Sequence, residues 1–296
     1  ICMSAVSLWV GFRFPVRADP TLWKFIILIY CIIAGQIPVW LLLQPRDFLN
    51  AHLLYIGLLA ILVSTLVLGI NGVPFSIPET ASGEVSHMPL WPFLFVTIAC
   101  GAVSGAHGLV CGGTTCKQIS NERDIRTIGY GAMLMESVLA LCVIFSIAGA
   151  FAYFTQPHGN GFKEIISLLK VNKAPLVFAL GVGWMLNGGL GIPLYVGTVC
   201  GILLLEGFLI TTIDTILRLT MYLLRELWRA IIPNWTICQN RFLNLGLGGT
   251  AMILLAISQG YKTVWPSFGA ANQLLAALTL IVATIYLKRL KRKHIA

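Results

Sequence analysis

Charged residues are scarce in this chain. Of its 296 residues only 10% are Asp, Glu, Lys or Arg, whereas 57% are apolar. Soluble globular domains carry about 25% charged residues, because a folded surface must be hydrated. This composition argues against a soluble enzyme, a disordered regulator and a secreted disulfide scaffold. It indicates that the chain folds in a lipid bilayer.

The few charges are also segregated along the chain. Asp, Glu, Lys and Arg are all absent from residues 48–78, 85–116 and 263–287. Each of these stretches can hold an apolar helix of about 20 residues, the length that crosses about 30 Å of hydrocarbon. We therefore expect an all-α polytopic membrane protein. Residues 1–296 should form one transmembrane domain with about seven or eight membrane segments.

Cysteine motifs are missing as well. The eight cysteines include no CxxC pair, and no histidine stands at metal-ligand spacing from two of them. We interpret them as small apolar packing residues, and we expect no metal and no cofactor. The net charge of +9 includes no basic stretch interleaved with aromatic residues. Contact with membrane lipids is therefore expected, and nucleic-acid binding is not.

Apolar runs and helix breakers predict where the segments lie. The apolar stretch 174–213 is too long for one span, and Gly188-Gly189, Gly191 and Pro193 should divide it into two pieces. Arg218–Arg229 carries arginines among Leu and Trp, which is typical of an interfacial amphipathic helix. The other expected spans are Trp23–Leu43, Leu53–Ile70, Trp91–Val110, Ile128–Phe154, Leu243–Ser258 and Asn272–Leu287.

The basic C-terminal tail, residues 288–296, sets the expected orientation. Five of the six residues 288–293 are Lys or Arg, and such clusters stay in the cytoplasm. Counting back through the spans places Arg218–Arg241 and Lys117–Arg126 on the same side. The loop Asn71–Leu90, which has no Lys or Arg, is expected outside.

Three acidic residues fall within apolar segments. Insertion of a charged side chain at the bilayer centre costs at least about 2.5–3.5 kcal/mol. Each of these residues is therefore expected to have a structural or functional role. Glu136 and Glu206 are either proton or ion carriers with pKa values raised by burial, or protonated structural residues. Asp214 precedes Arg218 by four residues, so the two can form an ion pair at the membrane edge.

Small and polar residues interrupt another apolar segment. Gly101 and Gly105 have GxxxG spacing, with Ser104 and His107 beside them. Small residues at this spacing allow two helices to pack closely. The alternative is that the helix unwinds here and exposes backbone groups to a substrate or ion, as in the broken helices of transporters.

Two adjacent amides, Asn272 and Gln273, stand at the start of the last expected span. They could cap the helix, bridge helices or contact a polar substrate. No nucleophile–base or metal-ligand constellation accompanies them, so we do not expect an enzyme.

Several long motifs resemble those of the carbon starvation protein CstA family. The first is Pro38–Asn50 (PVWLLLQPRDFLN), which is similar to the family's PVWLLLQPRDYLN. The others, in chain order, are Trp91–His107, Gly113–Gln118, Asn121–Asp124, Gly129–Glu136, Leu209–Thr215 with Arg218, and Phe268–Ala277.

This resemblance implies a secondary, ion-coupled transporter of the inner membrane that imports peptides or pyruvate-like carboxylates during carbon starvation. It also implies inverted helical repeats, broken helices and a first repeat that is partly missing. The alternative is a transport-inactive membrane sensor or partner subunit derived from such a transporter. Coupling would involve a proton or another cation. The candidate residues of the substrate and ion path are Gly101, Ser104, Gly105, His107, Glu136, Glu206, Thr211, Thr212, Asp214, Asn272 and Gln273.

Overall fold

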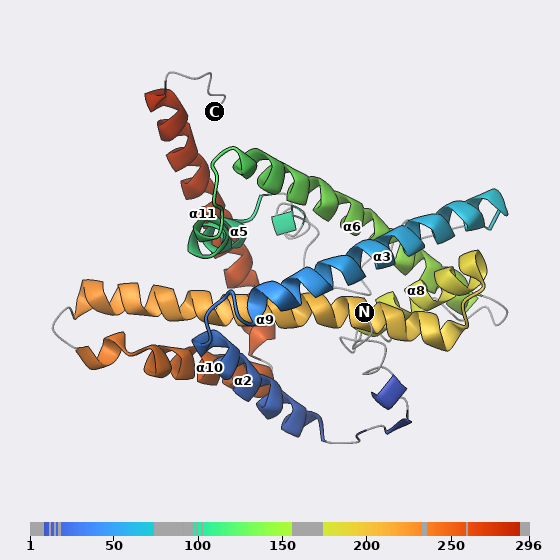
Figure 1. The fold of residues 1–296 in the computed structure, drawn as a ribbon, viewed down its shortest axis with the longest axis horizontal. Coiled ribbons are helices and arrows are strands. Elements are labelled where there is room, and N and C mark those ends of the chain that lie inside the picture. The colour runs from blue at the N-terminus through green and yellow to red at the C-terminus, as the bar shows by residue number, and fades with distance from the viewer. Residues whose placement is uncertain are drawn as a thin grey trace. The chain divides into compact units, whose positions relative to one another are not determined.

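The computed structural model describes residues 9–11, 13–14, 16, 19–73, 91, 98, 100–101, 103–155, 174–232, 236–258 and 260–290, and these are helical apart from turns (Figure 1). The helices are α2 (Pro20–Gln36), α3 (Leu43–Ile70), α5 (Gly105–Gly113), α6 (Asp124–Thr155), α8 (Ala174–Leu190), α9 (Leu194–Ile231), α10 (Arg241–Ile257) and α11 (Tyr261–Arg289). Two short 3-10 helices are η1 (Thr115–Lys117) and η2 (Thr236–Gln239). Most of the loop Asn71–Leu90 lies outside the described residues.

Four of these helices, α3, α6, α9 and α11, are long and apolar enough to cross a membrane. Three shorter apolar helices, α2, α8 and α10, accompany them. The all-α membrane architecture is therefore confirmed. The expected inverted repeats and the orientation of the C-terminus stay predictions.

The predicted interruption of the stretch 174–213 is confirmed. Helix α8 ends at Leu190, and α9 begins at Leu194. Gly191 has φ +69°, a left-handed conformation that glycine adopts without strain, and the φ angle of Pro193 suits the start of a helix. The Asn187 side chain donates a hydrogen bond of 2.9 Å to the carbonyl of Ile192 and closes the turn.

Two predicted boundaries are wrong. Arg218–Arg229 is not a separate amphipathic helix, because α9 continues through it to Ile231. No glycine or proline lies between Phe208 and Ile231 to end the helix. The last span also begins earlier than expected, at Tyr261, so Asn272 lies well inside α11 and cannot cap it.

The chain divides into two compact units. Unit 1 comprises residues 1–44, 88–119 and 212–296, and unit 2 comprises residues 45–87 and 120–211. In unit 1, α10 packs against α2 and α5 packs against α11. Its core contains Cys31 of α2, Leu217 and Met221 of α9, and Leu245 of α10.

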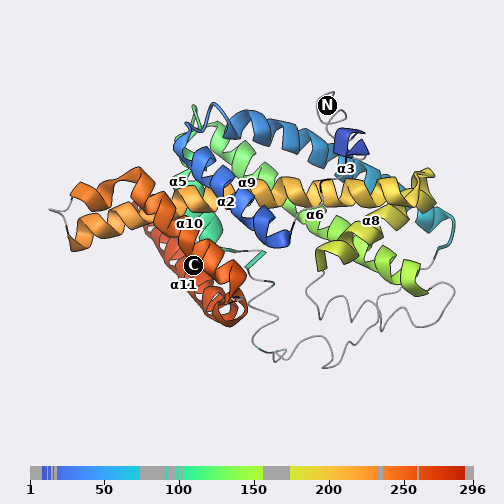
Figure 2. The same cartoon turned by 90° about the horizontal axis from the view of Figure 1, so that it is seen from below.

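The core of unit 2 joins α3, α6, α8 and the first half of α9. Its most deeply buried side chains include Ile61, Val182 and Met185. Helices α6 and α8 pack side by side, as the turned view in Figure 2 also shows. Gly181 of α8 lies directly against the backbone of Ser146 in α6. This contact follows the small-residue packing of membrane helices.

We expect Gly181→Ala to destabilise the protein by about 1–3 kcal/mol, because the added methyl group collides with the Ser146 backbone. Thermal unfolding of detergent-solubilised protein should show a lower Tm. Gly131→Ala in α6 is the matched control, since nothing lies within 4 Å of its added methyl group. Equal Tm values for the two variants would contradict the packing assignment.

Candidate functional site

The predicted helix break is present at Ser104. Gly101 is helical, Val103 lies in a bend, and Ser104 is extended with φ −104° and ψ 128°. Helix α5 then starts at Gly105, and the Ser104 hydroxyl accepts a hydrogen bond of 3.4 Å from the His107 backbone N–H. Ser104 is therefore the N-cap of α5, a position that serine favours.

Asn272 of α11 joins the two sides of this break. Its Oδ1 accepts hydrogen bonds from the Ser104 hydroxyl (3.0 Å) and the Ala106 backbone N–H (2.7 Å). Its Nδ2 donates to Cys100 Sγ at 3.2 Å. The Asn272 side chain is only 2% exposed. Of the three roles considered for this amide, the structure shows the bridge between helices.

Gly105 explains why the break and the close packing occur together. A Cβ atom at this position would collide with the Asn272 carbonyl and the Ala276 N–H of α11. The backbone just after the break therefore lies directly against α11. Non-helical backbone at membrane depth is tolerated where protein covers it in this way.

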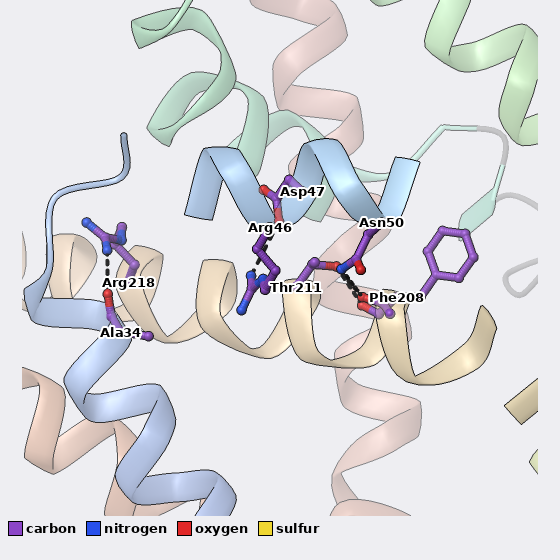
Figure 3. Close-up of polar contacts among 8 residues, drawn as sticks. Ala34, Arg46, Asp47, Asn50, Phe208, Thr211 and Arg218 are labelled. Atoms are coloured by element: carbon purple, nitrogen blue, oxygen red, sulfur yellow. Dashed lines mark hydrogen bonds and ion pairs between the residues drawn. The ribbon is translucent and has the colours of Figure 1, made fainter. Parts of the chain in front are cut away.

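The other predicted site residues are not part of this bridge. The side chains of His107 and Thr212 are exposed, and Asp214 is buried. In unit 2, the Thr211 hydroxyl donates to the carbonyls of Gly207 (3.0 Å) and Phe208 (2.9 Å) of its own helix (Figure 3).

The expected burial of the two glutamates is not observed. The side chains of Glu136 in α6 and Glu206 in α9 are both exposed on the described chain. Each stands on a face of its helix that no other described segment covers. Their role as ion carriers stays a prediction.

Unit 1 contains a cavity of about 450 Å³ that sequence reasoning missed. It lies between the end of α2, the α5–η1 turn, α9 and the start of α10. Motifs that are far apart in the sequence meet here. Its lining residues are Gly35, Gln36, Pro38, Val39, Trp40, Gln44, Gly113, Thr114, Lys117, Gln118, Arg218, Met221, Tyr222 and Arg241.

Arg218 is the buried cation of this cavity, with 5% of its surface exposed. Its Nη2 donates to the carbonyls of Ala34 (2.8 Å) and Ile37 (2.7 Å), at the end of α2 (Figure 3). The last carbonyls of a helix lack partners within it and carry partial negative charge. Arg218 Nε is buried and has no hydrogen-bond partner in the described part of the chain.

The cavity is rich in hydrogen-bond donors. Gln36 Nε2 is also buried without a partner among the described residues. Lys117 Nζ lies 5.2 Å from the centre of the Tyr222 ring, and Arg241 is the first residue of α10. Among the residues that the structure describes, the lining thus holds three cationic side chains and no carboxylate. Such a set suits an anionic ligand.

Two cations that line this cavity stand out in the sequence, but the sequence suggests other roles for them. In the sequence, Arg218 is interpreted as a partner of Asp214 and as part of an amphipathic helix, and Lys117 as a charge that sets orientation. Both stand in motifs that carry the family resemblance, together with Pro38 and Gln44. Their meeting depends on helix packing, which no local pattern reveals.

We expect Asn272→Leu to lower the stability of the protein by about 1–3 kcal/mol, because Ser104 and the Ala106 N–H lose their buried acceptor. A thermal shift in detergent measures this loss. The control is Leu274→Ala, two residues along α11 on an exposed position. A Tm unchanged in Asn272→Leu would show that the bridge does not hold α5.

Comparison with known proteins identifies relatives that match about nine tenths of the chain. The peptide transporter CstA of Escherichia coli K12 is 31% identical over 90% of this chain and 45% of its own length. The pyruvate/proton symporter BtsT of the same organism is 31% identical over 90% of this chain and 47% of its own. The peptide transporter CstA of Bacillus subtilis 168 is 31% identical, with coverages of 90% and 49%.

The chain therefore spans about half the length of the curated relatives it matches. No solved structure matches it. The family model for carbon starvation protein CstA matches residues 1–161 and 159–296, so that every residue is covered. This chain belongs to the carbon starvation protein CstA family.

Proposed function

We propose that this membrane protein acts in secondary, ion-coupled import of peptides or pyruvate-like small carboxylates during carbon starvation. The names of its relatives, peptide transporter and pyruvate/proton symporter, support transport over catalysis. We also propose that it resides in the inner membrane with its basic tail, residues 288–296, in the cytoplasm.

The observation that carries this proposal is the donor-rich cavity of unit 1. Pyruvate and peptides share a carboxylate, and a carboxylate accepts hydrogen bonds without donating any. Arg218 and Gln36 supply buried donors that have no partner among the described residues. Lys117 and Arg241 add positive charge to the same lining. Guanidinium groups bind carboxylates with particular strength.

Ion coupling requires a group that gains and loses a cation during transport. Glu136 of α6 and Glu206 of α9 are carboxylates within helices that can cross the membrane. An ionisable residue at such a position is expensive to place in lipid and is by default a functional candidate. Proton binding at Glu136 is the assignment that we test first.

The alternative is a transport-inactive sensor or partner subunit. Such a protein would keep the cavity around Arg218 and bind the same carboxylate, but it would not move the ligand across the membrane. Binding and flux must therefore be measured separately.

We expect Lys117→Glu to weaken pyruvate binding on the order of tenfold, about 1.4 kcal/mol, because a positive charge beside the cavity becomes negative. Lys117 is exposed, so the variant should fold. Binding of radiolabelled pyruvate to detergent-solubilised protein measures the change. Arg229→Glu is the control, since Arg229 is an exposed cation of α9 outside the cavity. Equal losses in both variants would indicate a general charge effect.

Uptake of labelled peptide and of pyruvate into proteoliposomes should increase when a pH gradient is imposed. Glu136→Gln should abolish this increase, because an amide cannot carry the proton. The matched control is Glu226→Gln, at an exposed position near the end of α9. Gradient-driven uptake that survives Glu136→Gln would refute the proton-carrier assignment. Pyruvate binding without any uptake would favour the sensor.

A further inference from the structure

Two cysteines differ from the other cysteines that the structure describes, because both are exposed and they lie close together. Cys111 and Cys116 are both exposed, and their Sγ atoms lie 3.4 Å apart in a hydrogen bond. Cys31 and Cys142, by contrast, are buried in the helix cores. The prediction that the cysteines are apolar packing residues is therefore wrong for Cys111 and Cys116.

The local backbone brings these two thiols together. Cys111 lies in the last turn of α5, and Cys116 lies in η1. The chain turns at Thr114, whose φ of −130° and ψ of −60° are not helical. A disulfide has an S–S length of about 2.05 Å, so the sulfurs need to approach by little more than 1 Å. Side-chain rotation within such a short turn can supply this movement.

We propose that Cys111 and Cys116 form a reversible disulfide by exchange with a low-molecular-weight disulfide, and that this bond locks one wall of the cavity. The two cysteines directly precede Lys117–Arg126, the segment predicted to lie on the cytoplasmic side. Thiols there are normally kept reduced, and a disulfide that forms is transient and regulatory. The dithiol is thus the resting state, and the disulfide responds to oxidation.

The exchange proceeds in two steps, formation of a mixed disulfide and its resolution by the second cysteine. The Cys116 thiolate attacks one sulfur of the small disulfide, which forms a mixed disulfide and releases the first small thiolate. Cys111 then loses its proton and attacks the Cys116 sulfur, which forms the Cys111–Cys116 bond and releases the second thiolate. The protein dithiol is oxidised by two electrons, and the small disulfide is reduced to two thiols that take up the two protons.

The hydrogen bond also favours this order of attack. The hydrogen bond with Cys116, together with partial desolvation, raises the pKa of the Cys111 thiol. A thiol with a raised pKa is a smaller source of thiolate at neutral pH. Cys111 therefore acts second, as the resolving thiol.

The bond would close a loop around part of the cavity lining. Gly113 and Thr114 lie between the two cysteines, and Lys117 follows directly, and all three line the cavity. Gly113 is packed so closely that an added Cβ would lie 2.6 Å from Leu219 Cδ1 of α9. A cross-link over this turn therefore fixes the wall that faces Arg218. This consequence for ligand binding rests on the proposed function, whereas formation of the disulfide does not.

The first test counts thiols on the full chain in detergent. Oxidised glutathione should remove two maleimide-reactive thiols per chain, Cys111 and Cys116, and dithiothreitol should restore both. Mass spectrometry should show the loss of two hydrogens and no bound glutathione. Cys111→Ser should abolish the internal bond and retain glutathione on Cys116, the attacking thiol, and Cys116→Ser should abolish the internal bond as well. The control Cys238→Ser should behave as wild type. A stable glutathione adduct on wild-type protein, an inter-chain cross-link, or two thiols left free would overturn the disulfide.

The second test measures radiolabelled pyruvate binding before and after oxidation. Oxidised wild type and Cys238→Ser should show a several-fold change in Kd that reduction reverses, and Cys116→Ser should show none. If the disulfide forms and the Kd stays the same, control of the cavity is refuted. If reduced protein binds no pyruvate, the proposed function fails, and the thiol count alone decides whether the disulfide exists.

Discussion

The contact between Arg218 and the end of α2 is the interaction on which unit 1 depends. Helix α2 ends at Gln36, shortly before Pro38, so the carbonyls of its last turn have no partners within the helix. Arg218 donates to the carbonyl of Ala34 in this last turn and to that of Ile37 just after it, while it is almost fully buried. This arrangement provides donors to the helix end and partners for Arg218 Nη2, and it leaves Arg218 Nε without a partner among the described residues. The same contact therefore shapes the fold and supplies the chemistry.

Close approach of helices is the second constraint, and glycine provides it in both units. Membrane helices gain little from burying apolar side chains against one another, because lipid is equally apolar. Gly105 and Gly181 each let one backbone reach the backbone of a neighbouring helix. In unit 1 this packing covers the break at Ser104, and Asn272 then satisfies the groups that the break exposes. The unwound segment is thus fixed to α11 by close packing and by hydrogen bonds.

Sequence patterns predicted the helical class, the break near Ser104 and the interruption before α9, since each depends on local composition or on glycine and proline. They did not predict that α9 continues through Arg218–Arg229. Arginines among Leu and Trp suggested a separate interfacial helix, but arginine does not end a helix. The patterns also misplaced Asn272, since polar residues near the start of an apolar run resemble a cap. The cavity could not be predicted, because Gln36, Lys117 and Arg218 are separated by long stretches and meet only through packing. The contact between Cys111 and Cys116 depends on the turn at Thr114, which no sequence motif marks.

The length of α9 has a consequence for the depth at which a solute is held. Its 38 residues span about 57 Å, whereas hydrocarbon is only about 30 Å thick. Arginines occur only in the last 14 residues of this helix, at 218, 225 and 229. We therefore expect this end of the helix to extend into the headgroup region, where long cationic side chains reach water and lipid phosphates. Arg218 then sits near the dielectric boundary of the bilayer, so a hydrated anion can reach it without first crossing the apolar interior.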